Sequence, residues 1–355
     1  MLSGLFLLPN AKGIMMSNFK IKIEEQGFEY LQDDGDTLLR SALRSGLGFP
    51  YECNSGGCGS CKFELLDGEL EEIWPDAPGL SARDIRKGRK LACQCRATSD
   101  CTIKVNLEHH AVPESKPAKV MLTFIEVKSL TDDMAEFVFK SNTRAQFIPG
   151  QFALLSLPGV KGERAYSMSN LPNDEGEWSF IIKKMPGGQG SSFIFDQLKP
   201  SDKIELDGPY GLAFLKSEIP REIVCIGGGS GLSPMVSIAR SVARDAKLDE
   251  HILHLFYGGR GPKDICTPAI VAEFGDMKSR LICYHAVSDP DLAKKHEWDG
   301  AIGFIHELVE EELGKDLTQY EFYFCGPPPM TQAVQKMLMV DHKVPFEQLH
   351  FDRFF

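Results

Sequence analysis

The segment CNSGGCGSC at residues 53–61 decides how the first third of this 355-residue chain folds. It contains three cysteines in the spacing C-x4-C-x2-C, separated by glycine, serine and asparagine. A fourth cysteine, Cys93, follows 32 positions after the third. Glycine adopts φ > 0 without strain, so a short loop can turn several thiols and backbone N–H groups toward one point. The segment therefore predicts a metal–sulfur centre held by a tight loop.

This spacing is the plant-type [2Fe–2S] pattern. A zinc site and unliganded core thiols are the alternatives. Zinc loops usually pair C-x2-C with a second such pair or with histidines, which this segment lacks. Cys95 competes for the fourth position, but the motif LACQ at residues 91–94 matches the ferredoxin pattern at Cys93. The predicted ligands are Cys53, Cys58, Cys61 and Cys93.

The composition limits the partners and the compartment. Asp and Glu number 50 against 39 Lys and Arg, and the net charge of -11 repels nucleic-acid phosphate and anionic lipid. No apolar run approaches the roughly 18 residues of a membrane-spanning helix. The apolar stretch at residues 4–9 is too short for a signal-peptide core, so we expect a cytoplasmic protein without disulfides. Residues 1–16 are predicted to be an upstream extension, with Met15 or Met16 as an alternative start.

The order of the predicted elements divides the remaining chain into three domains. Residues 17–108 combine alternating strands with a capped helix, which indicates a compact α+β domain. Residues 109–118 (HHAVPESKPA) have the composition of a linker. Short strands separated by Gly and Pro suggest a small β-barrel over residues 119–216. Strands alternate with helices over residues 217–355, which predicts a parallel sheet.

Two helix starts are also predicted in the first domain. Asp36 and Thr37 provide capping side chains for a helix that Gly46 ends. Ser81 and Asp84 have the spacing of a capping box.

A second motif, RAYSMSN at residues 164–170, lies in the predicted barrel. Alone it could be an ordinary edge strand. It is R-x-Y-S-x-x-N, and at this point the chain resembles the ferredoxin–NADP reductase superfamily, whose flavin signature has this form. The resemblance implies that Arg164 pairs with the FAD pyrophosphate, Tyr166 packs on the isoalloxazine and Ser167 hydrogen-bonds near flavin N5. A guanidinium, a flat ring and a short hydroxyl suit these roles.

The segment GGQGSSF at residues 187–193 accompanies this motif and precedes a short helical stretch. Backbone N–H groups at a helix N-terminus can accept a pyrophosphate. Gly190 and Ser191 are therefore predicted to contact FAD.

A third motif, GGGSGLSP at residues 227–234, lies between a predicted strand and a predicted helix. It is not G-x-G-x-x-G, because Leu232 occupies the last glycine position. It still exposes backbone donors and a helix N-terminus to a phosphate, and it resembles the nicotinamide-dinucleotide loop of the same superfamily. A turn needed only for helix packing is the alternative. The predicted cofactor-binding residues here are Gly227, Gly229, Gly231 and Pro234.

The segment FCGPPPM at residues 324–330 ends the last predicted parallel strand. Ligands in such sheets sit beyond the carboxyl ends of the strands, so Cys325 is predicted to point toward the dinucleotide crevice. The resemblance places Cys325 and Gly326 near the nicotinamide and the flavin. It also implies that a terminal aromatic ring, Phe354 or alternatively Phe355, closes over the flavin.

The predicted nicotinamide is NADH rather than NADPH. No acidic residue closes the strand before Arg260 to hold a ribose 2′-hydroxyl, and Arg260 could accept a 2′-phosphate. Relatives that use NADH nevertheless carry Y-G-x-R, as residues 257–260 do here.

The domain order resembles the reductase components of bacterial multicomponent oxygenases, particularly toluene, aromatic and alkene di-iron monooxygenases. The resemblance implies an α+β β-grasp ferredoxin domain, a six-stranded antiparallel β-barrel FAD domain and an α/β parallel-sheet NAD domain. Electrons would pass from NADH through FAD and [2Fe–2S] to a Rieske-type ferredoxin or to a di-iron hydroxylase. Cys325, Ser167 and Phe354 are expected at the hydride-transfer site, in a monomer. A free-standing flavin or quinone reductase and a redox sensor are the alternatives.

Overall fold

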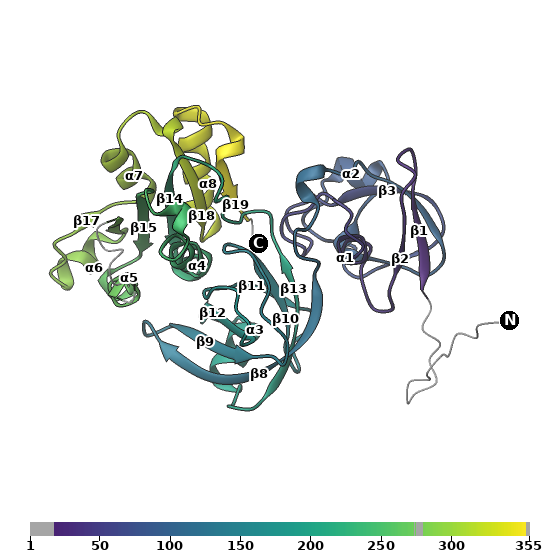
Figure 1. Cartoon of the computed structure of the whole chain (residues 1–355), viewed down its shortest axis with the longest axis horizontal. Helices are drawn as coiled ribbons and strands as arrows, with labels where there is room; N and C mark the ends of the chain where they lie inside the picture. The colour runs from purple at the N-terminus through teal and green to yellow at the C-terminus, as the bar shows by residue number, and fades with distance from the viewer. Residues whose placement is uncertain (1–17, 273, 275–279, 353–355) are drawn as a thin grey trace. The chain divides into compact units, whose positions relative to one another are not determined.

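The structure is a computed structural model that describes residues 18–272, 274 and 280–352. The chain forms two compact units, of which the first ends at Lys116 and the second begins at Pro117 (Figure 1). The predicted extension at residues 1–16 lies outside the described residues. No helix among the described residues is long and apolar enough to cross a membrane.

The first unit is an α+β fold built on one mixed sheet. Its strand order is β2-β1-β7-β3-β5, in which β1 and β7 are parallel and the other neighbours antiparallel. A separate small sheet pairs β4 with β6. The elements are β1 (Phe19–Ile23), β2 (Glu29–Gln32), α1 (Leu38–Arg44), β3 (Lys62–Asp67), β4 (Leu70–Glu72), α2 (Ala82–Arg86), β5 (Arg89–Leu91), β6 (Cys95–Ala97) and β7 (Cys101–Lys104).

The predicted helix caps of this unit are confirmed. The Thr37 hydroxyl accepts a hydrogen bond from the Arg40 N–H at the start of α1. Gly46 follows that helix with φ +82°, a left-handed conformation that favours glycine. Ser81 and Asp84 form a reciprocal capping box at the start of α2.

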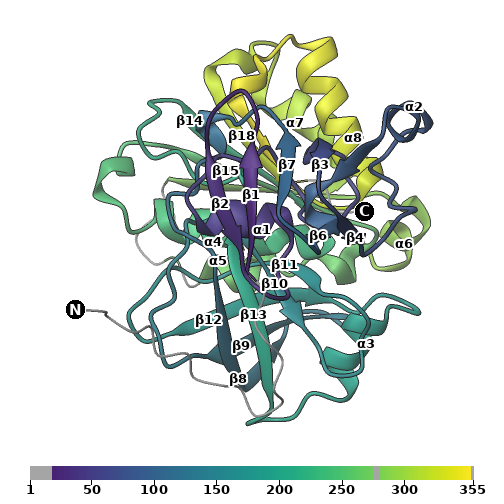
Figure 2. The same ribbon diagram turned by 90° about the vertical axis from the view of Figure 1, so that its right-hand side faces the viewer.

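The second unit begins with the predicted six-stranded antiparallel barrel, which is confirmed. The strand order is β11-β10-β13-β8-β9-β12, and the isolated bridge between Met168 and Phe180 brings the two edge strands together. Buried aromatic rings such as Phe139 and Phe180 fill the interior. Figure 2 shows several of these strands with α3 beside them. The elements are β8 (Ala118–Ser129), β9 (Met134–Lys140), β10 (Phe152–Ser156), β11 (Arg164–Ser167), β12 (Glu177–Lys183), α3 (Gln189–Asp196) and β13 (Lys203–Tyr210).

The remainder of the second unit is the predicted α/β domain with a parallel sheet. The strand order is β17-β16-β15-β14-β18-β19, and every neighbouring pair is parallel. The chain starts in the middle at β14, moves outward to β17 and returns on the other side at β18, which creates a crevice at the carboxyl ends. The strands are β14 (Glu222–Gly228), β15 (Leu253–Gly259), β16 (Leu281–Val287), β17 (Ala301–Ile302), β18 (Tyr320–Cys325) and β19 (Leu349–Phe351).

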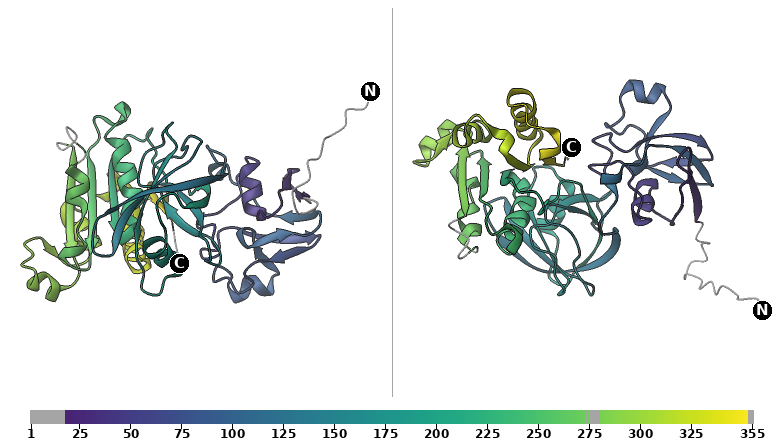
Figure 3. Two further views of the ribbon diagram at one scale, coloured as in Figure 1. Left: turned by 90° about the horizontal axis from the view of Figure 1, so that it is seen from below. Right: turned by 45° about the horizontal axis from the view of Figure 1, so that its top comes forward.

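Helices cover both faces of this sheet (Figure 3). One buried cluster joins β14 and β15 to α4 and α5, and a second joins the opposite face to α7 and α8. The helices are α4 (Leu232–Val242), α5 (Thr267–Val271), α6 (Pro290–Lys295), α7 (Ile305–Leu313) and α8 (Pro328–Lys336).

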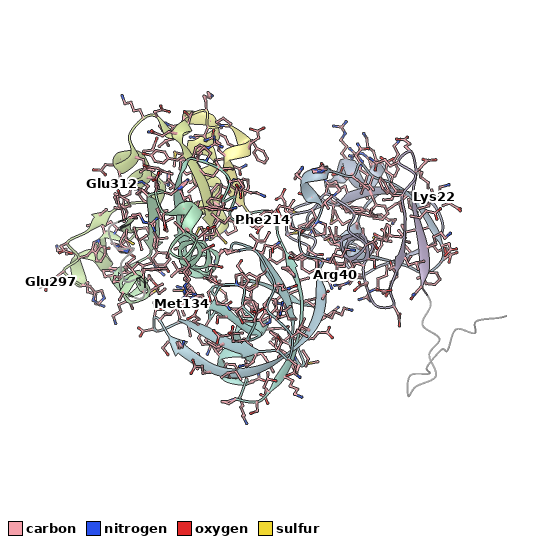
Figure 4. The ribbon with its side chains drawn as sticks, viewed as in Figure 1. Lys22, Arg40, Met134, Phe214, Glu297 and Glu312 are labelled. Carbon is pink, nitrogen blue, oxygen red and sulfur yellow. The ribbon has the colours of Figure 1, made fainter. Side chains whose placement is uncertain are left out.

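The barrel and the parallel-sheet domain share a core. Met134 at the start of β9 and Ile181 on β12 belong to the same buried cluster as α4 (Figure 4). The Tyr323 hydroxyl accepts a hydrogen bond of 2.9 Å from the Lys216 N–H, which joins the end of the barrel segment to β18. This shared core fixes the barrel's ligand-binding motifs relative to the carboxyl edge of the sheet.

Candidate functional site

The four predicted cluster ligands lie together in the first unit as two pairs of thiols. Cys53 is hydrogen-bonded to Cys58, and Cys61 is hydrogen-bonded to Cys93. Two pairs of thiols match the coordination of two irons, each of which takes two thiolates in a [2Fe–2S] cluster. No three His, Cys, Asp or Glu side chains converge to hold a single metal ion anywhere in the described part of the chain.

Backbone N–H groups of the cysteine loop point at these sulfurs. The Cys53 Sγ accepts hydrogen bonds from the N–H groups of Ser55 at 3.4 Å and Cys58 at 3.3 Å, and the Ser60 N–H donates to Cys58 Sγ at 3.5 Å. Hydrogen bonds from the Cys58 thiol and these N–H groups lower the pKa of Cys53 to about 5, although burial opposes them. The loop N–H groups thus favour thiolate charge on Cys53, whereas the hydrogen bond with Cys53 and burial raise the pKa of Cys58.

The conformation of the loop requires glycine at two positions. Gly56 has φ +88° and Gly59 has φ +77°, and a Cβ on Gly59 would lie 2.3 Å from the Gly79 oxygen. Asn54 is 2% exposed, and its side-chain amide finds no partner among the described residues. A buried amide without a partner beside Cys53 fits a site whose polar ligand completes its hydrogen bonding.

Cys95, the competitor for the fourth ligand position, stands outside the two thiol pairs. It begins β6, where burial raises its pKa to about 12, and Cys93 rather than Cys95 is hydrogen-bonded to Cys61. The structure thus brings the four predicted ligands together and leaves Cys95 as a buried neutral thiol at neutral pH.

The predicted FAD residues converge at the edge strand β11 and the start of α3. A Cβ on Gly190 would lie 2.9 Å from Arg164 Cγ and 3.4 Å from the Tyr166 hydroxyl, so only glycine leaves room there. The Arg164 guanidinium donates to the carbonyls of residues 161–163 at 3.0–3.2 Å, which holds it above that turn. Burial raises the pKa of Tyr166 to about 12, so its hydroxyl stays neutral and can donate.

The hydroxyls of Ser191 and Ser167 differ in their hydrogen bonding. The Ser191 hydroxyl accepts from the Met185 N–H at 3.0 Å, which ties the loop before α3 to the helix. For the Ser167 hydroxyl, no hydrogen bond occurs within the described residues, while its carbonyl accepts one from Ser233 at 2.6 Å. A free hydroxyl at the end of β11 fits the predicted contact with a flavin. These residues match the chemistry of an FAD site.

A cavity of about 580 Å³ lies at the carboxyl edge of the parallel sheet, within the size range of a cofactor site. Of the predicted nicotinamide residues, Gly229 and Arg260 line it. Its walls are largely apolar, and residues from the barrel close one side. The lining is Lys183, Met185, Gly228, Gly229, Tyr257–Arg260, Asp264, Ala286, Ser288, Gly303–His306, Pro327, Pro329, Met330 and Ala333.

Other predicted nicotinamide residues lie behind this cavity and shape it. Gly227 pairs with Cys325 across β14 and β18, and Gly231 packs against the Cys325 main chain. Burial raises the pKa of Cys325 to about 12, and Asp352 adds to this rise, so the group is a neutral thiol. Gly326 also lies at this junction, since a Cβ on Gly231 would be 2.6 Å from its nitrogen, and Pro234 is the third residue of α4; neither residue lines the cavity.

Two charged residues of this cavity, Asp264 and Lys183, have no local signal in the sequence. Asp264 follows β15 by several residues, but a turn folds it back, so that its carboxylate accepts from the N–H groups of Arg260 at 3.0 Å and Gly261 at 2.9 Å. An acidic residue does therefore stand at the end of that strand, contrary to the sequence expectation. Lys183 reaches the cavity from the end of β12, with its amine 3.1 Å from Asp133 and 3.4 Å from Asp264.

Three predicted roles depend on residues that the structure leaves undescribed or does not test. Phe354 and Phe355 lie outside the described residues. The structure shows which chemical groups Ser167 and Cys325 present, and their roles in hydride transfer stay predictions.

Family models cover most of the chain in the predicted order. A 2Fe-2S iron-sulfur cluster binding domain matches residues 21–98, an oxidoreductase FAD-binding domain matches 121–214, and an oxidoreductase NAD-binding domain matches 225–336. The first match supports the iron–sulfur interpretation of the cysteine loop over the zinc alternative.

Known relatives match almost the whole chain. A ferredoxin–NAD(P)+ reductase of Metapseudomonas resinovorans is 43% identical over 341 residues, 95% of this chain and 100% of that protein. The ferredoxin–NAD+ reductase component of an alkene monooxygenase system from Xanthobacter autotrophicus is 37% identical, covering 90% of this chain and 95% of its own. A solved ferredoxin reductase in carbazole 1,9a-dioxygenase has a TM-score of 0.86 at 40% identity, covering 96% of this chain and all of that one.

These relatives confirm the resemblance found in the motifs, and the family models confirm the order of the three domains. The chain is an oxidoreductase that belongs to the ferredoxin–NAD(P)+ reductase superfamily, in the group with an N-terminal [2Fe–2S] domain.

Proposed function

We propose that this chain is the NADH-dependent reductase of an oxygenase system and that its acceptor is a small ferredoxin. The observation that carries the proposal is the cavity at the sheet edge, which combines the glycine loop (Gly228, Gly229) with barrel residues (Lys183, Met185). A dinucleotide bound there would reach from the parallel sheet to the flavin motif on the same compact unit. When bound, FAD takes up a hydride from a nicotinamide and releases the two electrons singly, as a [2Fe–2S] cluster requires.

The residues of the barrel would hold FAD. Arg164 offers a guanidinium to a pyrophosphate, and the N–H groups of Gly190 and Ser191 at the start of α3 offer further donors. Tyr166 presents a ring and a neutral hydroxyl, and Ser167 presents a hydroxyl without a partner in the described chain. These are the donor types that a dinucleotide flavin needs.

NADH is the proposed donor. The carboxylate of Asp264 is fixed at the end of β15 by two backbone N–H groups. Arg260 is 3.9 Å from the carboxylate of Asp289 and Lys183 is 3.4 Å from that of Asp264, so both cations at this strand end already face carboxylates. Two carboxylates at this position favour a ribose with free hydroxyls and disfavour a 2′-phosphate.

The proposed acceptor rests on the names of the relatives. One relative described above is a ferredoxin–NAD(P)+ reductase, and the other is the ferredoxin–NAD+ reductase component of an alkene monooxygenase system. Direct transfer to a di-iron hydroxylase is the second possibility. The proposed domains are residues 17–108, 119–216 and 217–355, each of which contains one family match.

The test is an anaerobic assay of NADH-driven cytochrome c reduction with and without a purified Rieske-type ferredoxin. We expect the ferredoxin to accelerate cytochrome c reduction in a saturable manner, and NADH to be used at least about tenfold more efficiently than NADPH. A rate of cytochrome c reduction that does not change when the ferredoxin is added would contradict the proposed acceptor. Equal use of NADPH would contradict the proposed donor.

A further inference from the structure

Three side chains on one face of α4 bind the backbone of the flavin motif. The Ser233 hydroxyl donates to the Ser167 carbonyl at 2.6 Å, and the Ser237 hydroxyl donates to the Asn170 carbonyl at 2.7 Å. The Arg240 guanidinium donates to the Ser169 carbonyl at 2.9 Å. Positions i, i+4 and i+7 lie on one side of a helix, so one face of α4 lies along the flavin motif and binds its backbone at three points.

Ser233 has an additional role at the seam of the barrel. The edge strands β11 and β12 approach each other at the bridge between Met168 and Phe180, and the Ser169 N–H donates to the Ser179 carbonyl at 2.7 Å. At the next position the strands no longer pair directly. There the Ile181 N–H donates to the Ser233 hydroxyl at 3.0 Å, and this hydroxyl in turn donates to the Ser167 carbonyl. One side chain of α4 thus completes the ladder that closes the barrel beside the flavin motif.

The contact is buried and includes a charged pair. Ser233 is 1% exposed and Ser237 is 0% exposed. Arg240 also binds Glu136 of β9 at 3.0 Å, and the same carboxylate oxygen accepts the Ser169 hydroxyl at 2.6 Å. Buried hydrogen bonds of this kind have fixed geometry, because breaking one leaves an unsatisfied group in the interior.

The same helix begins at the nicotinamide loop. The turn Gly229–Gly231 leads directly into α4 at Leu232, so Ser233 is the second residue of the helix. We propose that the α4 face formed by Ser233, Ser237 and Arg240 is a positioning device that sets the nicotinamide loop against the flavin motif for hydride transfer. This inference rests on the proposed NADH-to-FAD function. The three are positioning residues, since they act through the backbone of residues 167–170.

The test compares Ser233→Ala, Ser237→Ala and the conservative Ser233→Thr in the FAD-loaded, full-length protein. Stopped-flow flavin bleaching at saturating NADH should slow about ten- to a hundredfold in the alanine variants, because small misplacements of reacting groups lower rates by that order. NADH affinity and FAD content should stay within about twofold, and Ser233→Thr should restore the rate. Ser241→Ala is the matched control, since that hydroxyl on the same helix makes no hydrogen bond within the described residues.

Hydrogen–deuterium exchange provides a readout that does not depend on turnover. Ser233→Ala should speed exchange at the Ile181 amide, and Ser237→Ala should loosen the peptide that contains Asn170, with little change in the first unit. If Ser233→Ala does not fold, the bleaching rate and the exchange pattern of Ser237→Ala alone test the positioning role. Faster exchange or lower thermal stability with an unchanged bleaching rate would overturn the positioning role. If NADH does not bleach the flavin of the unaltered protein, the proposed function itself fails and this inference fails with it.

Discussion

The main-chain oxygen of Cys325 lies so close to Gly231 that a Cβ on Gly231 would be 2.1 Å from it. This contact joins the loop after β14 to the C-G-P-P segment after β18, two segments that the parallel register already places side by side. Gly231 has φ -60°, which any residue can adopt, so glycine is required here for space rather than for backbone conformation. The two nicotinamide motifs therefore form one joined surface.

Gly231→Ala should separate these two segments. We expect the affinity for NAD+, measured from the change in the flavin spectrum, to fall by about tenfold or more, roughly 1.4 kcal/mol. The reason is that the overpacked Cβ can be accommodated only if the backbone moves. Gly227→Ala should lower the affinity for NAD+ less, since its Cβ would meet no atom closer than 3.5 Å. FAD and iron content should not change. Equal losses for both variants would show that the contact with Cys325 is not what matters.

Cys58→Ser should remove the cluster. Serine cannot supply the second thiolate of the Cys53–Cys58 pair, so the iron content and cytochrome c reduction should fall to background, while NADH-driven ferricyanide reduction through the flavin survives. Cys95→Ala is the matched control and should keep its iron, because Cys95 lies outside the two pairs. Iron loss in the Cys95 variant would reopen the choice of fourth ligand.

Cys325 should behave as a neutral thiol. Burial raises its pKa from 9.0 to about 12, so at pH 8 its thiolate fraction is about a thousandfold smaller than that of a free cysteine. Because the folded pKa is the higher one, this group's contribution to stability is complete below about pH 9 and is lost as the pH rises toward 12. Cys325 is only partly buried, so mass-spectrometric mapping after iodoacetamide treatment at pH 8 should find it modified more slowly than a free cysteine, and rapid alkylation would contradict the raised pKa.

Cys325→Ala tests whether this thiol helps to align the nicotinamide. We expect flavin reduction by NADH to slow by about one to three orders of magnitude, or roughly 1.4 to 4 kcal/mol. Unchanged stopped-flow rates would assign Cys325 to the core behind the cavity, where its backbone already packs.

Asp264→Asn should weaken the preference for NADH. Removing the carboxylate at the end of β15 lowers the repulsion of a 2′-phosphate, and we expect the ratio of kcat/KM for NADPH over NADH to rise about tenfold. Asp291→Asn on α6 is a control for a change of surface charge alone. A similar rise in the control would point to net charge rather than to the position of Asp264.

The sequence predicted the motifs better than the contacts between them. The cysteine loop, the edge strand with Arg164 and the glycine loop have local spacing that dictates their conformation. In β13 (Lys203–Tyr210), Asp207, Gly208 and Pro209 are residues typical of loops, so no local pattern marks this segment as a strand. In the fold this strand pairs on both sides, and Asp207 is buried with its carboxylate bound to the Tyr210 hydroxyl at 2.8 Å.

The missed cavity residues depend on tertiary structure. Lys183 belongs to the barrel and meets the glycine loop only because the two domains share a core. Asp264 reaches the end of β15 through a turn at Gly261 and Pro262 that brings it back by several residues. No local pattern in the sequence predicts that Lys183 meets the glycine loop or that Asp264 lies at the end of β15.

An anaerobic titration with NADH shows whether electrons pass from the flavin to the cluster, when flavin absorbance and the electron paramagnetic resonance of the cluster are recorded on the same samples. Two electrons for FAD and one for [2Fe–2S] require about 1.5 NADH per chain. We predict that flavin bleaching and the signal of the reduced cluster both reach completion at that ratio. Bleaching that stops at about one NADH, with no cluster signal, would show that the two centres are not connected and would contradict the account.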